Sequence, residues 1–435
     1  NPYWIQNRIQ SKETRMRSII SLSANLRINS WLTVQARGSV DYISDKMRQK
    51  FYASTAPALC GANGRYIEMD YQETLIYGDV MAMGKRKWED FALDVAIGGS
   101  INDKNVNSTR YDSKNASLKY ANVFNLANIV MNGSASIDQK IDSRRQLQSV
   151  FGTAQVGYQD KVFLDLTARN DWASTLAYTS HEKSGFFYPS AGLSFLIDKW
   201  IQLPEWISFA KLRGTYSKVG NDIPQFITNS VSHITAGGEL QANDAAPFKE
   251  MEPEMTHSVE VGTEWRFFQS RLGFNLTYYR TNTHNQFFKL PALAGDMYAY
   301  RYVNAGDIQN RGWELTVDAT PVLTPDFTWK TSLNFSSNRN KIKELHEELK
   351  ELVYGPSSFS SSYAMKLVKG GSIGDIYGYK LKRAPDGQVV WKDGITARTT
   401  EFEYVGNAYP AWKAGFSNEF SYKNFRVSIL FDGQW

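Results

Sequence analysis

The sequence predicts an all-β fold, an antiparallel transmembrane β-barrel with long extracellular loops. Apolar and polar residues alternate along many segments, and short and long connections take turns between these segments. The segments are about ten to fourteen residues long, whereas strands of soluble proteins average nearer five or six. About ten tilted residues are enough to cross an apolar band of roughly 25 Å. Together these features favour strands that span a membrane.

The clearest alternation lies in residues 16–42, where two alternating runs flank the turn residues Asn29 and Ser30. The apolar set is Ile20, Leu22, Leu26, Leu32, Val34 and Val40, and the polar set is Ser21, Asn25, Arg27, Gln35, Arg37 and Asp41. Successive side chains of a strand point to opposite faces, so this hairpin has one apolar wall and one hydrophilic wall. We expect lipid on the first and the lumen on the second.

Twelve further segments continue the series. They are residues 88–101, 106–120, 143–158, 161–172, 186–197, 207–219, 256–267, 271–283, 308–319, 327–339, 411–421 and 425–435. With the opening hairpin, the sequence therefore predicts fourteen strands.

The predicted connections alternate in length. Short ones are 29–30, 102–105, 159–160, 198–206, 268–270, 320–326 and 422–424, and long ones are 44–87, 121–142, 173–185, 220–255, 284–307 and 340–410. Outer-membrane barrels have short periplasmic turns and long extracellular loops, so all the long segments fall on one rim. Within the last loop, residues 376–381 and the following Pro385, Asp386 and Gly387 predict a hairpin. Apolar residues at helical spacing predict a short amphipathic helix over 341–354.

Composition excludes several classes of protein. The hydrophobic fraction is 42% of 435 residues, and no window approaches the roughly 20 apolar residues of a spanning helix. The aromatic fraction of 14% fits the girdles of a membrane barrel but also an aromatic-rich soluble β-sandwich. A net charge of +5, with basic residues scattered among acidic ones, argues against nucleic-acid binding. The single cysteine, Cys60, excludes an internal disulfide.

The residues give no catalytic or metal-binding pattern, and we expect neither an enzyme nor a cofactor. The five histidines include no His-Glu-x-x-His arrangement. Glu260 and Glu264 share one face of a strand, but four residues separate their backbones by about 13 Å. Glycosidases need carboxyl groups about 5 Å or about 6.5 to 9.5 Å apart, so this pair does not suit them.

Binding residues are therefore sought in the loops and on the luminal wall. The loop aromatics and amides are Trp172, Tyr178, Phe226, Asn229, Phe287, Phe288, Tyr298, Tyr300, Tyr302 and Tyr363. Two interpretations stay open for each: contact with a sugar ring or a partner protein, or packing of the loops and rim. Arg169 and Asp171 on the luminal side allow either contact with a plug domain or an ion pair across strands.

Six segments resemble one family. They are residues 166–176, 187–195, 211–221, 253–262, 304–315 (Asn-Ala-Gly-Asp-Ile-Gln-Asn-Arg-Gly-Trp-Glu-Leu) and 406–410 (Gly-Asn-Ala-Tyr-Pro). These motifs resemble the SusC/RagA family of TonB-dependent outer-membrane transporters of Bacteroidetes, and the resemblance covers essentially residues 1–435. It implies a 22-stranded barrel in the bacterial outer membrane, closed by an N-terminal plug. It also implies import of oligosaccharides or peptides, driven through TonB, with a SusD-like lipoprotein as a lid.

The alternation gives expectations about the luminal residues, and the resemblance gives expectations about the extent of the chain. Side chains expected to face the lumen or plug are Arg27, Arg37, Arg169, Asp171, Glu260 and Glu264. Compared with a complete family member, we expect residues 1–435 to lack the secretory signal, the plug, the TonB-contacting segment and the closing strands. We therefore expect a partial barrel that would not insert or transport by itself, since free strand edges are not tolerated in hydrocarbon.

Two other classes of function remain as alternatives. An adhesion or secretion barrel, such as an autotransporter domain, would use its long loops to bind surfaces and would follow a passenger domain. A soluble glycan-binding β-protein would be expressed without detergent.

Overall fold

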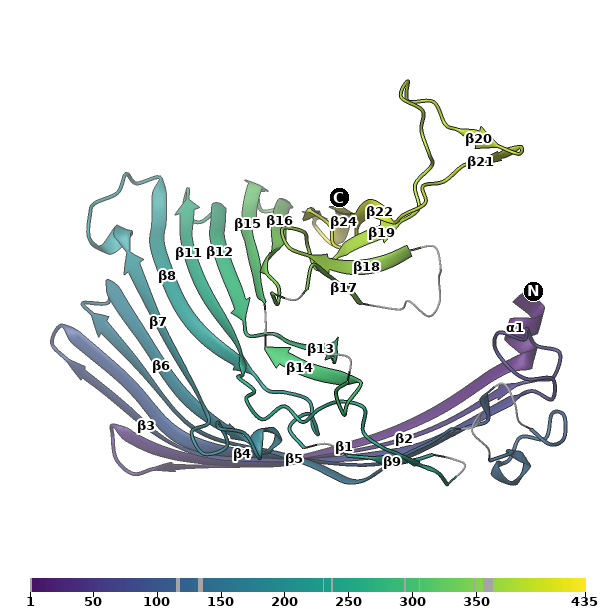
Figure 1. Ribbon diagram of the computed structural model, residues 1–435. Helices are drawn as coiled ribbons and strands as arrows, with labels where there is room; N and C mark the ends of the chain where they lie inside the picture. Colours follow the sequence, from purple (N-terminus) through teal and green to yellow (C-terminus); the bar gives the residue numbers. More distant parts are fainter. Residues whose placement is uncertain are drawn as a thin grey trace.

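One antiparallel sheet of fourteen strands dominates the fold (Figure 1). The computed structural model describes residues 2–114, 118–131, 136–229, 231–235, 238–292, 295–304, 306–347, 349–354 and 363–435. The strands of the sheet are β1 (Ile9–Arg27), β2 (Leu32–Phe51), β3 (Arg65–Trp88), β4 (Phe91–Asp112), β5 (Ser136–Tyr158), β6 (Val162–Ala173), β7 (Phe186–Leu196), β8 (Ile207–Asn221), β11 (Glu254–Phe267), β12 (Leu272–His284), β15 (Asp307–Leu323), β16 (Phe327–Glu344), β23 (Trp412–Tyr422) and β24 (Phe425–Gln434). Each pairs with the next in this order, which confirms the predicted all-β antiparallel fold of fourteen strands.

The smaller elements lie at the ends of the strands. They are helix α1 (Pro2–Arg8), the 3-10 turns η2 (Leu126–Asn128), η3 (Ser174–Leu176) and η4 (Ile197–Lys199), and the loop strands β9 (His233–Ile234), β10 (Leu240–Gln241), β13 (Phe287–Pro291), β14 (Tyr300–Asn304), β17 (Glu351–Tyr354), β18 (Tyr363–Val368), β19 (Asp375–Gly378), β20 (Trp391–Lys392), β21 (Ile395–Thr396) and β22 (Glu403–Asn407). No helix of the described residues is both long enough and apolar enough to cross a bilayer.

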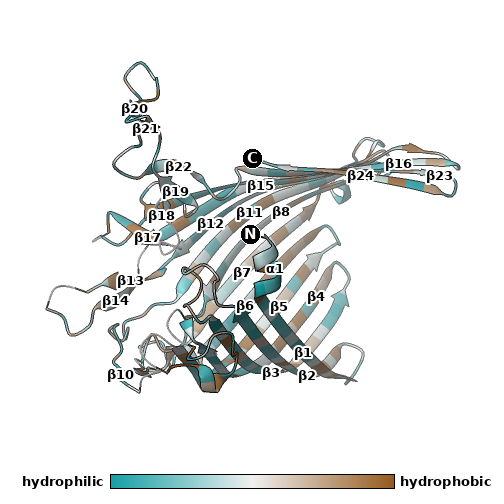
Figure 2. Cartoon of the chain, turned by 90° about the vertical axis from the view of Figure 1, so that its right-hand side faces the viewer, coloured by the Kyte–Doolittle hydropathy of each residue, from teal (hydrophilic) through white to brown (hydrophobic). Residues whose placement is uncertain are grey.

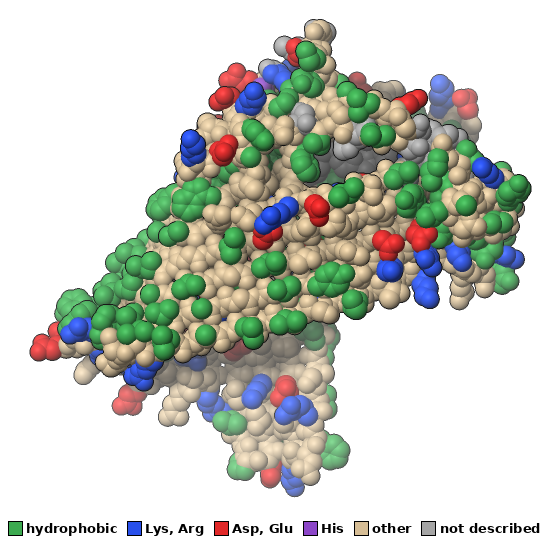
Figure 3. Space-filling view, turned by 90° about the horizontal axis from the view of Figure 1, so that it is seen from below, with side chains coloured by type: hydrophobic (Ala, Val, Ile, Leu, Met, Phe, Trp, Pro, Cys, Tyr) green, Lys and Arg blue, Asp and Glu red, His purple; other side chains and the backbone are tan. Residues whose placement is uncertain are grey.

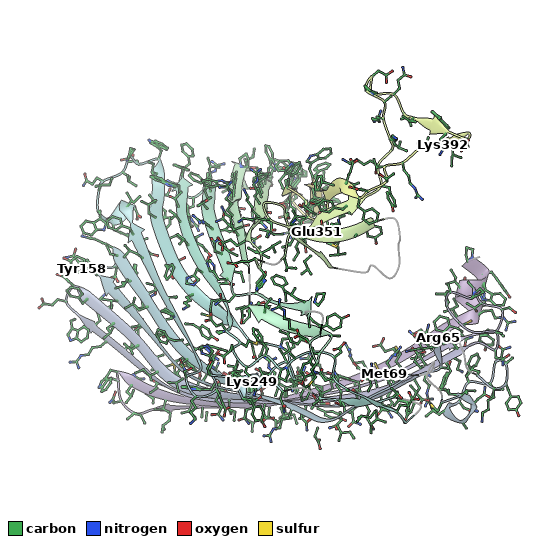
Figure 4. All side chains as sticks on the ribbon, in the orientation of Figure 1. Arg65, Met69, Tyr158, Lys249, Glu351 and Lys392 are labelled. Atoms are coloured by element: carbon green, nitrogen blue, oxygen red, sulfur yellow. The ribbon has the colours of Figure 1, made fainter. Side chains whose placement is uncertain are left out.

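Short and long connections alternate between the fourteen strands, as predicted. The short ones are 28–31, 89–90, 159–161, 197–206, 268–271, 324–326 and 423–424, and the long ones are 52–64, 113–135, 174–185, 222–253, 285–306 and 345–411. Figure 4 shows the two ends of the sheet, with Tyr158 at a short turn and Arg65 at the opposite, long-loop end. All long connections therefore leave one rim.

Two predictions near the start of the sheet are wrong. Residues 65–87, which we expected in a loop spanning 44–87, belong to strand β3. The expected turn at 102–105 does not exist, because β4 runs unbroken from Phe91 to Asp112 and replaces the predicted strands 88–101 and 106–120. The polar residues Asp103 and Lys104 lie in mid-strand, where one pairs with Arg144 and the other with Glu73. The first error misses one strand and the second adds one, so the predicted number of strands still equals fourteen.

The predicted helix at 341–354 is also wrong. Ile342 lies in β16, fully buried, and pairs in register with Ile308 of β15. Leu345 and Leu352 pack around these two residues together with Leu367. Residues 351–354 form β17, which pairs with β18. The helical spacing of the apolar residues therefore reflects packing of a strand end and a neighbouring strand, not a helix.

The hairpin predicted within the last loop is confirmed. Arg383 and Val389 form a bridge around Pro385 and Asp386, and the Gly387 amide donates to the Ala384 carbonyl at 2.8 Å. It lies in a segment, with β20 and β21, that projects away from the sheet (Figure 1). The same loop also contributes the four-stranded sheet β17–β18–β19–β22.

The sheet is curved, and the loop strands β13, β14 and β17 to β19 lie within the curve (Figure 1). Along the strands, hydrophobic and hydrophilic residues alternate (Figure 2). On the convex face, β1 carries Ile20, Leu22 and Leu26, each more than half exposed. Seen from below, hydrophobic side chains spread over this face, and most charged ones lie toward its ends (Figure 3). Exposed apolar area of this extent marks contact with lipid or protein.

Aromatic side chains border the apolar band of the convex face. Near the short turns, Phe195 stacks on Trp200 at 5.2 Å between ring centroids, and Trp206 on Phe267 at 5.6 Å. On β23, Trp412 and Tyr422 lie at opposite ends of the same face. Ten residues span about 33 Å along a strand, which a tilt of about 40° reduces to about 25 Å. This is the height of an apolar band in a bilayer.

Candidate functional site: the concave wall and its loops

Paired charges line the concave face of the first strands. Arg37 of β2 faces Asp79 of β3, with its Nε 3.0 Å from the carboxylate. The Asp79 side chain is completely buried, whereas the Arg37 side chain is about half exposed at 47%. The Asp79 carboxylate therefore lies beneath the Arg37 guanidinium, which stands at the surface of the concave wall. The remaining N–H groups of the guanidinium stay available as hydrogen-bond donors.

The same arrangement repeats toward the long-loop rim. Arg15 binds Asp45 through Nε and Nη2 at 2.7 and 2.6 Å, and Arg17 binds Asp41 through the same two atoms at 2.9 and 2.5 Å. Both carboxylates are mostly buried and both guanidiniums mostly exposed. Because each pair is internally neutral, this wall offers N–H donors to hydroxyl or carbonyl oxygens without a large net charge.

A third group joins strands β3 and β4. Lys104 contacts Oε2 of Glu73 at 2.8 Å, and the Tyr71 hydroxyl donates a hydrogen bond to the same oxygen. Glu73 is thus held between a cation and a phenol. The sequence prediction missed Tyr71, Glu73 and Lys104, because it placed β3 in a loop and cut β4 at Lys104. Alternation gave no signal for them, because their convex-face neighbours Asp70, Gln72, Asp103 and Asn105 are polar as well.

Arg169 and Asp171, predicted at the lumen, form an ion pair within one strand. The Arg169 Nε lies 2.6 Å from the Asp171 carboxylate two residues along β6, so the pair does not cross strands. Arg169 also donates through Nη2 to Ser149 of β5 at 2.7 Å and lies over the ring of Phe151 at 5.7 Å. These contacts fix the guanidinium against the concave wall.

The other predicted luminal residues share this face but not one cluster. The paired registers place Arg27, Arg37, Arg169, Asp171, Glu260 and Glu264 all on the concave side. Glu264 pairs with Arg266 at 2.9 Å, Glu260 accepts a long bond from Ser258 at 3.5 Å, and Arg27 donates to the Asn29 carbonyl. They form separate local contacts along the wall.

Three long loops meet in one apolar cluster over this wall, which we call the loop cluster. Its members are Ala173, Leu176, Phe186, Ile223, Ile227 and Met251, with Leu147, Tyr188, Phe248, Phe287 and Tyr302 packed against them. Leu147 and Tyr188 belong to β5 and β7, so the cluster attaches the loops to the concave face. Lys249 and Glu351 lie within the curve in Figure 4. The loops are thereby held inside the sheet rather than splayed outward.

The predicted loop aromatics divide between packed and exposed positions. Phe287 and Tyr302 belong to the loop cluster, and Phe288 packs beside Ile308 and Ile342. Lys289 lies 4.2 Å from the ring centroid of Tyr300. Trp172 lies in β6 and its indole donates to the Lys183 carbonyl at 3.0 Å. Tyr298 is half-buried, and the exposed residues are Tyr178, Phe226, Asn229, Tyr300 and Tyr363. The structure does not gather the ten into one surface.

A buried ion triad holds the end of the β3–β4 hairpin at the long-loop rim. Asp112 is 2% exposed and binds Arg65 through two bonds of 2.8 Å and Arg110 through one of 2.9 Å. Burial raises the pKa of the Asp112 carboxyl, but the hydrogen bonds from Arg65 and from the Lys114 amide outweigh it and leave the pKa below its usual value. The described residues bring together no set of three or more His, Cys, Asp or Glu side chains suited to a metal ion.

Comparisons with known proteins agree with this geometry. A family model described as "TonB dependent receptor-like, beta-barrel" matches residues 1–426. The TonB-dependent receptor P3 of Formosa agariphila is 26% identical over 316 residues, which are 66% of this chain and 31% of that protein. The TonB-dependent receptor SusC of Bacteroides thetaiotaomicron is 25% identical over 218 residues, or 47% of this chain and 21% of that protein.

Among solved structures, the RagAB peptide transporter has the same fold. It superposes with a TM-score of 0.77 at 19% identity, covering 99% of this chain and 48% of that chain. The chain thus spans about a third or less of the curated relatives it matches, and about half of this solved transporter chain.

Proposed function

Because the chain belongs to the TonB-dependent receptor-like β-barrel family, whose members reside in the bacterial outer membrane, we propose that it builds the wall and outer loops of an energy-coupled importer. Members of this family are transporters rather than enzymes. One observation carries the proposal: the sheet is apolar on its convex face, charged and polar on its concave face, and its long loops pack inside the curve. This arrangement suits a water-filled lumen that loops narrow from outside.

The proposed substrate is an oligosaccharide, with a peptide as the second candidate. Guanidinium groups whose carboxylates lie beneath them, as at Arg15, Arg17 and Arg37, supply N–H donors for hydroxyl or carbonyl oxygens. Exposed loop aromatics such as Phe226 and Tyr178 supply flat apolar surfaces. The peptide candidate is favoured by the likeness to the RagAB peptide transporter over 99% of this chain.

The proposed partners follow from the same relatives. In this proposal a SusD-like surface lipoprotein closes over the long-loop rim, and TonB supplies energy through a plug that occupies the lumen. The six concave-face residues predicted from the sequence, Arg27, Arg37, Arg169, Asp171, Glu260 and Glu264, would then face the lumen or the plug. The exposed aromatics Tyr178, Phe226 and Tyr363 are the proposed contacts for ligand or lid.

The test is uptake in the native host. Removing the chain's coding region at its own locus should abolish growth on one class of oligosaccharides or peptides as sole carbon source, and loss of TonB should have the same effect. Restoring the gene should restore both growth and uptake of the labelled substrate. Unchanged uptake of every substrate together with loss of surface attachment would contradict the importer and support an adhesion barrel.

A further inference from the structure

Three arginines stand side by side on the convex face of β12, β15 and β16. Arg280 is the register partner of Arg311, and Arg311 is the register partner of Arg339. All three side chains are exposed. We call these residues the arginine row. Side chains directly opposite on neighbouring strands have Cβ atoms about 4.5 to 5.5 Å apart, so three like charges repel unless an anion lies among them.

The row has no acidic partner on the described part of the chain. Arg280 donates from Nε to the amide oxygen of Asn282 at 3.2 Å, a neutral acceptor. The side chains of Arg311 and Arg339 form no hydrogen bond or ion pair with any described residue. The next register row toward the long loops contains Lys218, His257, Asn282, Gln309 and Lys341, again without an acid. The patch is therefore basic over two rows.

Other cations on the convex face are arranged differently. Arg48 of β2 binds Glu68 at 2.9 Å, Lys46 lies 3.8 Å from Asp70, and Arg144 of β5 binds Asp103 at 2.6 Å. Each of these three cations therefore has its own carboxylate. The arginine row differs from them, because it places three adjacent guanidinium groups together without an acidic partner on the described part of the chain.

The arginine row lies at a defined depth of the barrel wall. Tyr278 of β12 and Trp313 of β15 lie two positions closer to the short turns than the arginine row, and their ring centroids are 4.8 Å apart. Trp412 of β23 belongs to the same register row. Below them the same face continues with Leu276, Leu315 and Phe335. Tyr and Trp concentrate where hydrocarbon meets headgroups. The row therefore stands on the long-loop side of that boundary, at the height of the outer-leaflet headgroups.

A hollow of about 620 Å³ opens at the same place. Its lining includes Tyr278, Arg311, Trp313, Arg339 and Ala411. This volume falls within the range of about 300 to 1,000 Å³ typical of ligand sites. It combines two guanidinium groups with two aromatic rings, so it presents charge toward the headgroup and apolar surface toward the hydrocarbon.

We propose that the arginine row and this hollow bind the phosphorylated headgroup of an outer-leaflet glycolipid, the lipid A part of lipopolysaccharide. Guanidinium groups bind phosphate through two parallel hydrogen bonds, and a phosphate monoester, with a charge of about −1.5 to −2, offsets most of the positive charge of these three arginines, which have no acidic partner among the described residues. The acyl chains lie along the apolar band below Tyr278 and Trp313. The site lies outside the lumen and depends on the barrel's membrane location, not on the transported substrate.

The experiment compares two triple variants made at the native locus. The test variant is R280Q/R311Q/R339Q, and the control is K46Q/R48Q/R144Q, which removes three convex-face cations that already have carboxylate partners. Each protein is purified from outer membranes in mild detergent, its fold is checked by heat-modifiable mobility, and retained lipid A is counted by native mass spectrometry. We expect at least a tenfold loss of retained lipid A for the test variant and none for the control.

Adding lipids or free phosphate to the purified protein tests whether the bound phosphate belongs to lipid A. Purified lipid A should change the tryptophan fluorescence of delipidated protein, and enzymatically dephosphorylated lipid A should not. Equal lipid retention in both variants, equal binding of dephosphorylated lipid, or full displacement of lipid A by millimolar inorganic phosphate would each overturn the proposal. A change of oligomeric state in the test variant with unchanged lipid would also overturn it, in favour of a second copy of the chain.

Discussion

Leu22 and Ser21 are chain neighbours on opposite faces of β1. Leu22 is 76% exposed on the convex face opposite Gly38, and Ser21 lies on the concave face opposite Ser39. We expect Leu22→Arg to lower the free energy of unfolding from the bilayer by about 2 to 4 kcal/mol, since an arginine near the midplane must leave water. Ser21→Arg, whose side chain reaches the polar wall near Asp41, should change it by less than about 1 kcal/mol. Urea titrations of each protein in lipid vesicles measure this difference, and equal losses at both positions would refute the assignment of the faces.

Asp112 makes the stability of the β3–β4 hairpin end depend on pH. Its pKa lies below the usual value of a carboxyl, so its ionised form stabilises the folded state above about pH 4, the value in an unfolded chain. That stabilisation falls as pH drops through the lower, folded-state pKa. At neutral pH, Asp112→Asn should cost about 3 kcal/mol, because Arg65 and Arg110 lose a buried partner.

Hydrogen exchange of the strand-end amides near Arg65 and Asp112 measures this effect. Exchange should be faster in the variant than in the wild type at pH 7, and this difference should shrink as the pH falls from about 4 through the lower, folded-state pKa of Asp112. A difference that grows in acid would contradict the sign of the pKa shift.

At the scale of elements, Gly312 sets the distance between β15 and its neighbours. A Cβ at this position would lie 2.0 Å from the Ser337 carbonyl oxygen and 2.6 Å from the Tyr279 hydroxyl. Tyr279 is its register partner on β12, and its ring covers the space where a side chain would stand. Gly312→Ala should therefore reduce the yield of heat-modifiable barrel severalfold, since the carbonyl belongs to the paired strand β16. Gly415→Ala on β23, where nothing lies within 4 Å, is the matched control.

The loop cluster should behave as a unit separate from the barrel wall. Met251 is fully buried and packs with Leu176 and Ile223 from other loop segments. Met251→Ala should destabilise the loops by about 2 to 5 kcal/mol through the cavity it leaves. Limited proteolysis should then cut loops 174–185 and 222–253 faster, while heat-modifiable mobility of the barrel stays unchanged. Protection equal to that of the wild type would show that the cluster does not hold the loops.

The sequence predicted elements well where one face meets hydrocarbon. Strands such as β6 and β11 alternate strictly, because every second residue must be apolar there. Prediction failed beyond the apolar band. In β4, Asp103 pairs outward with Arg144 and Lys104 pairs inward with Glu73, so both faces are polar and the segment looks like a turn. In β3, Gly78 and Gly84 replace apolar residues on the convex face and weaken the same pattern.

The sequence predicted that charged residues line the concave face, but it did not predict which of these residues form ion pairs. Alternation alone places Arg37 and Arg169 on the concave face, yet it does not show that Asp79 or Asp171 binds them, since those contacts depend on strand register and on neighbours within a strand. The residues of the loop cluster were still harder to predict from the sequence. Its residues are spread between 147 and 302, and those from loops 174–185, 222–253 and 285–306 lie in segments without a periodic pattern. Long-range packing of irregular loops leaves no local signature in sequence.

At the scale of the whole molecule, the strands form a wall of uneven height. β3, β4 and β5 each span more than twenty residues, whereas β7, β23 and β24 span about half that number. The band between aromatic residues needs only about ten residues of a tilted strand. The first strands therefore continue well beyond the bilayer as sheet, and the ion pairs Arg15–Asp45 and Arg65–Asp112 lie on this outer extension.

The central claim is that one face of this sheet meets lipid and the other meets water. Nitroxide scanning along residues 32–42 of β2 tests it most directly, using protein from the native locus in lipid vesicles. Cys60→Ser provides the background, although burial already raises the pKa of the Cys60 thiol and slows its labelling. We predict oxygen accessibility maxima at the even positions, such as Val34 and Val40, and maxima for a polar nickel reagent at the odd positions, such as Gln35 and Arg37. Accessibility without a period of two, or with the two reagents exchanged, would contradict the account.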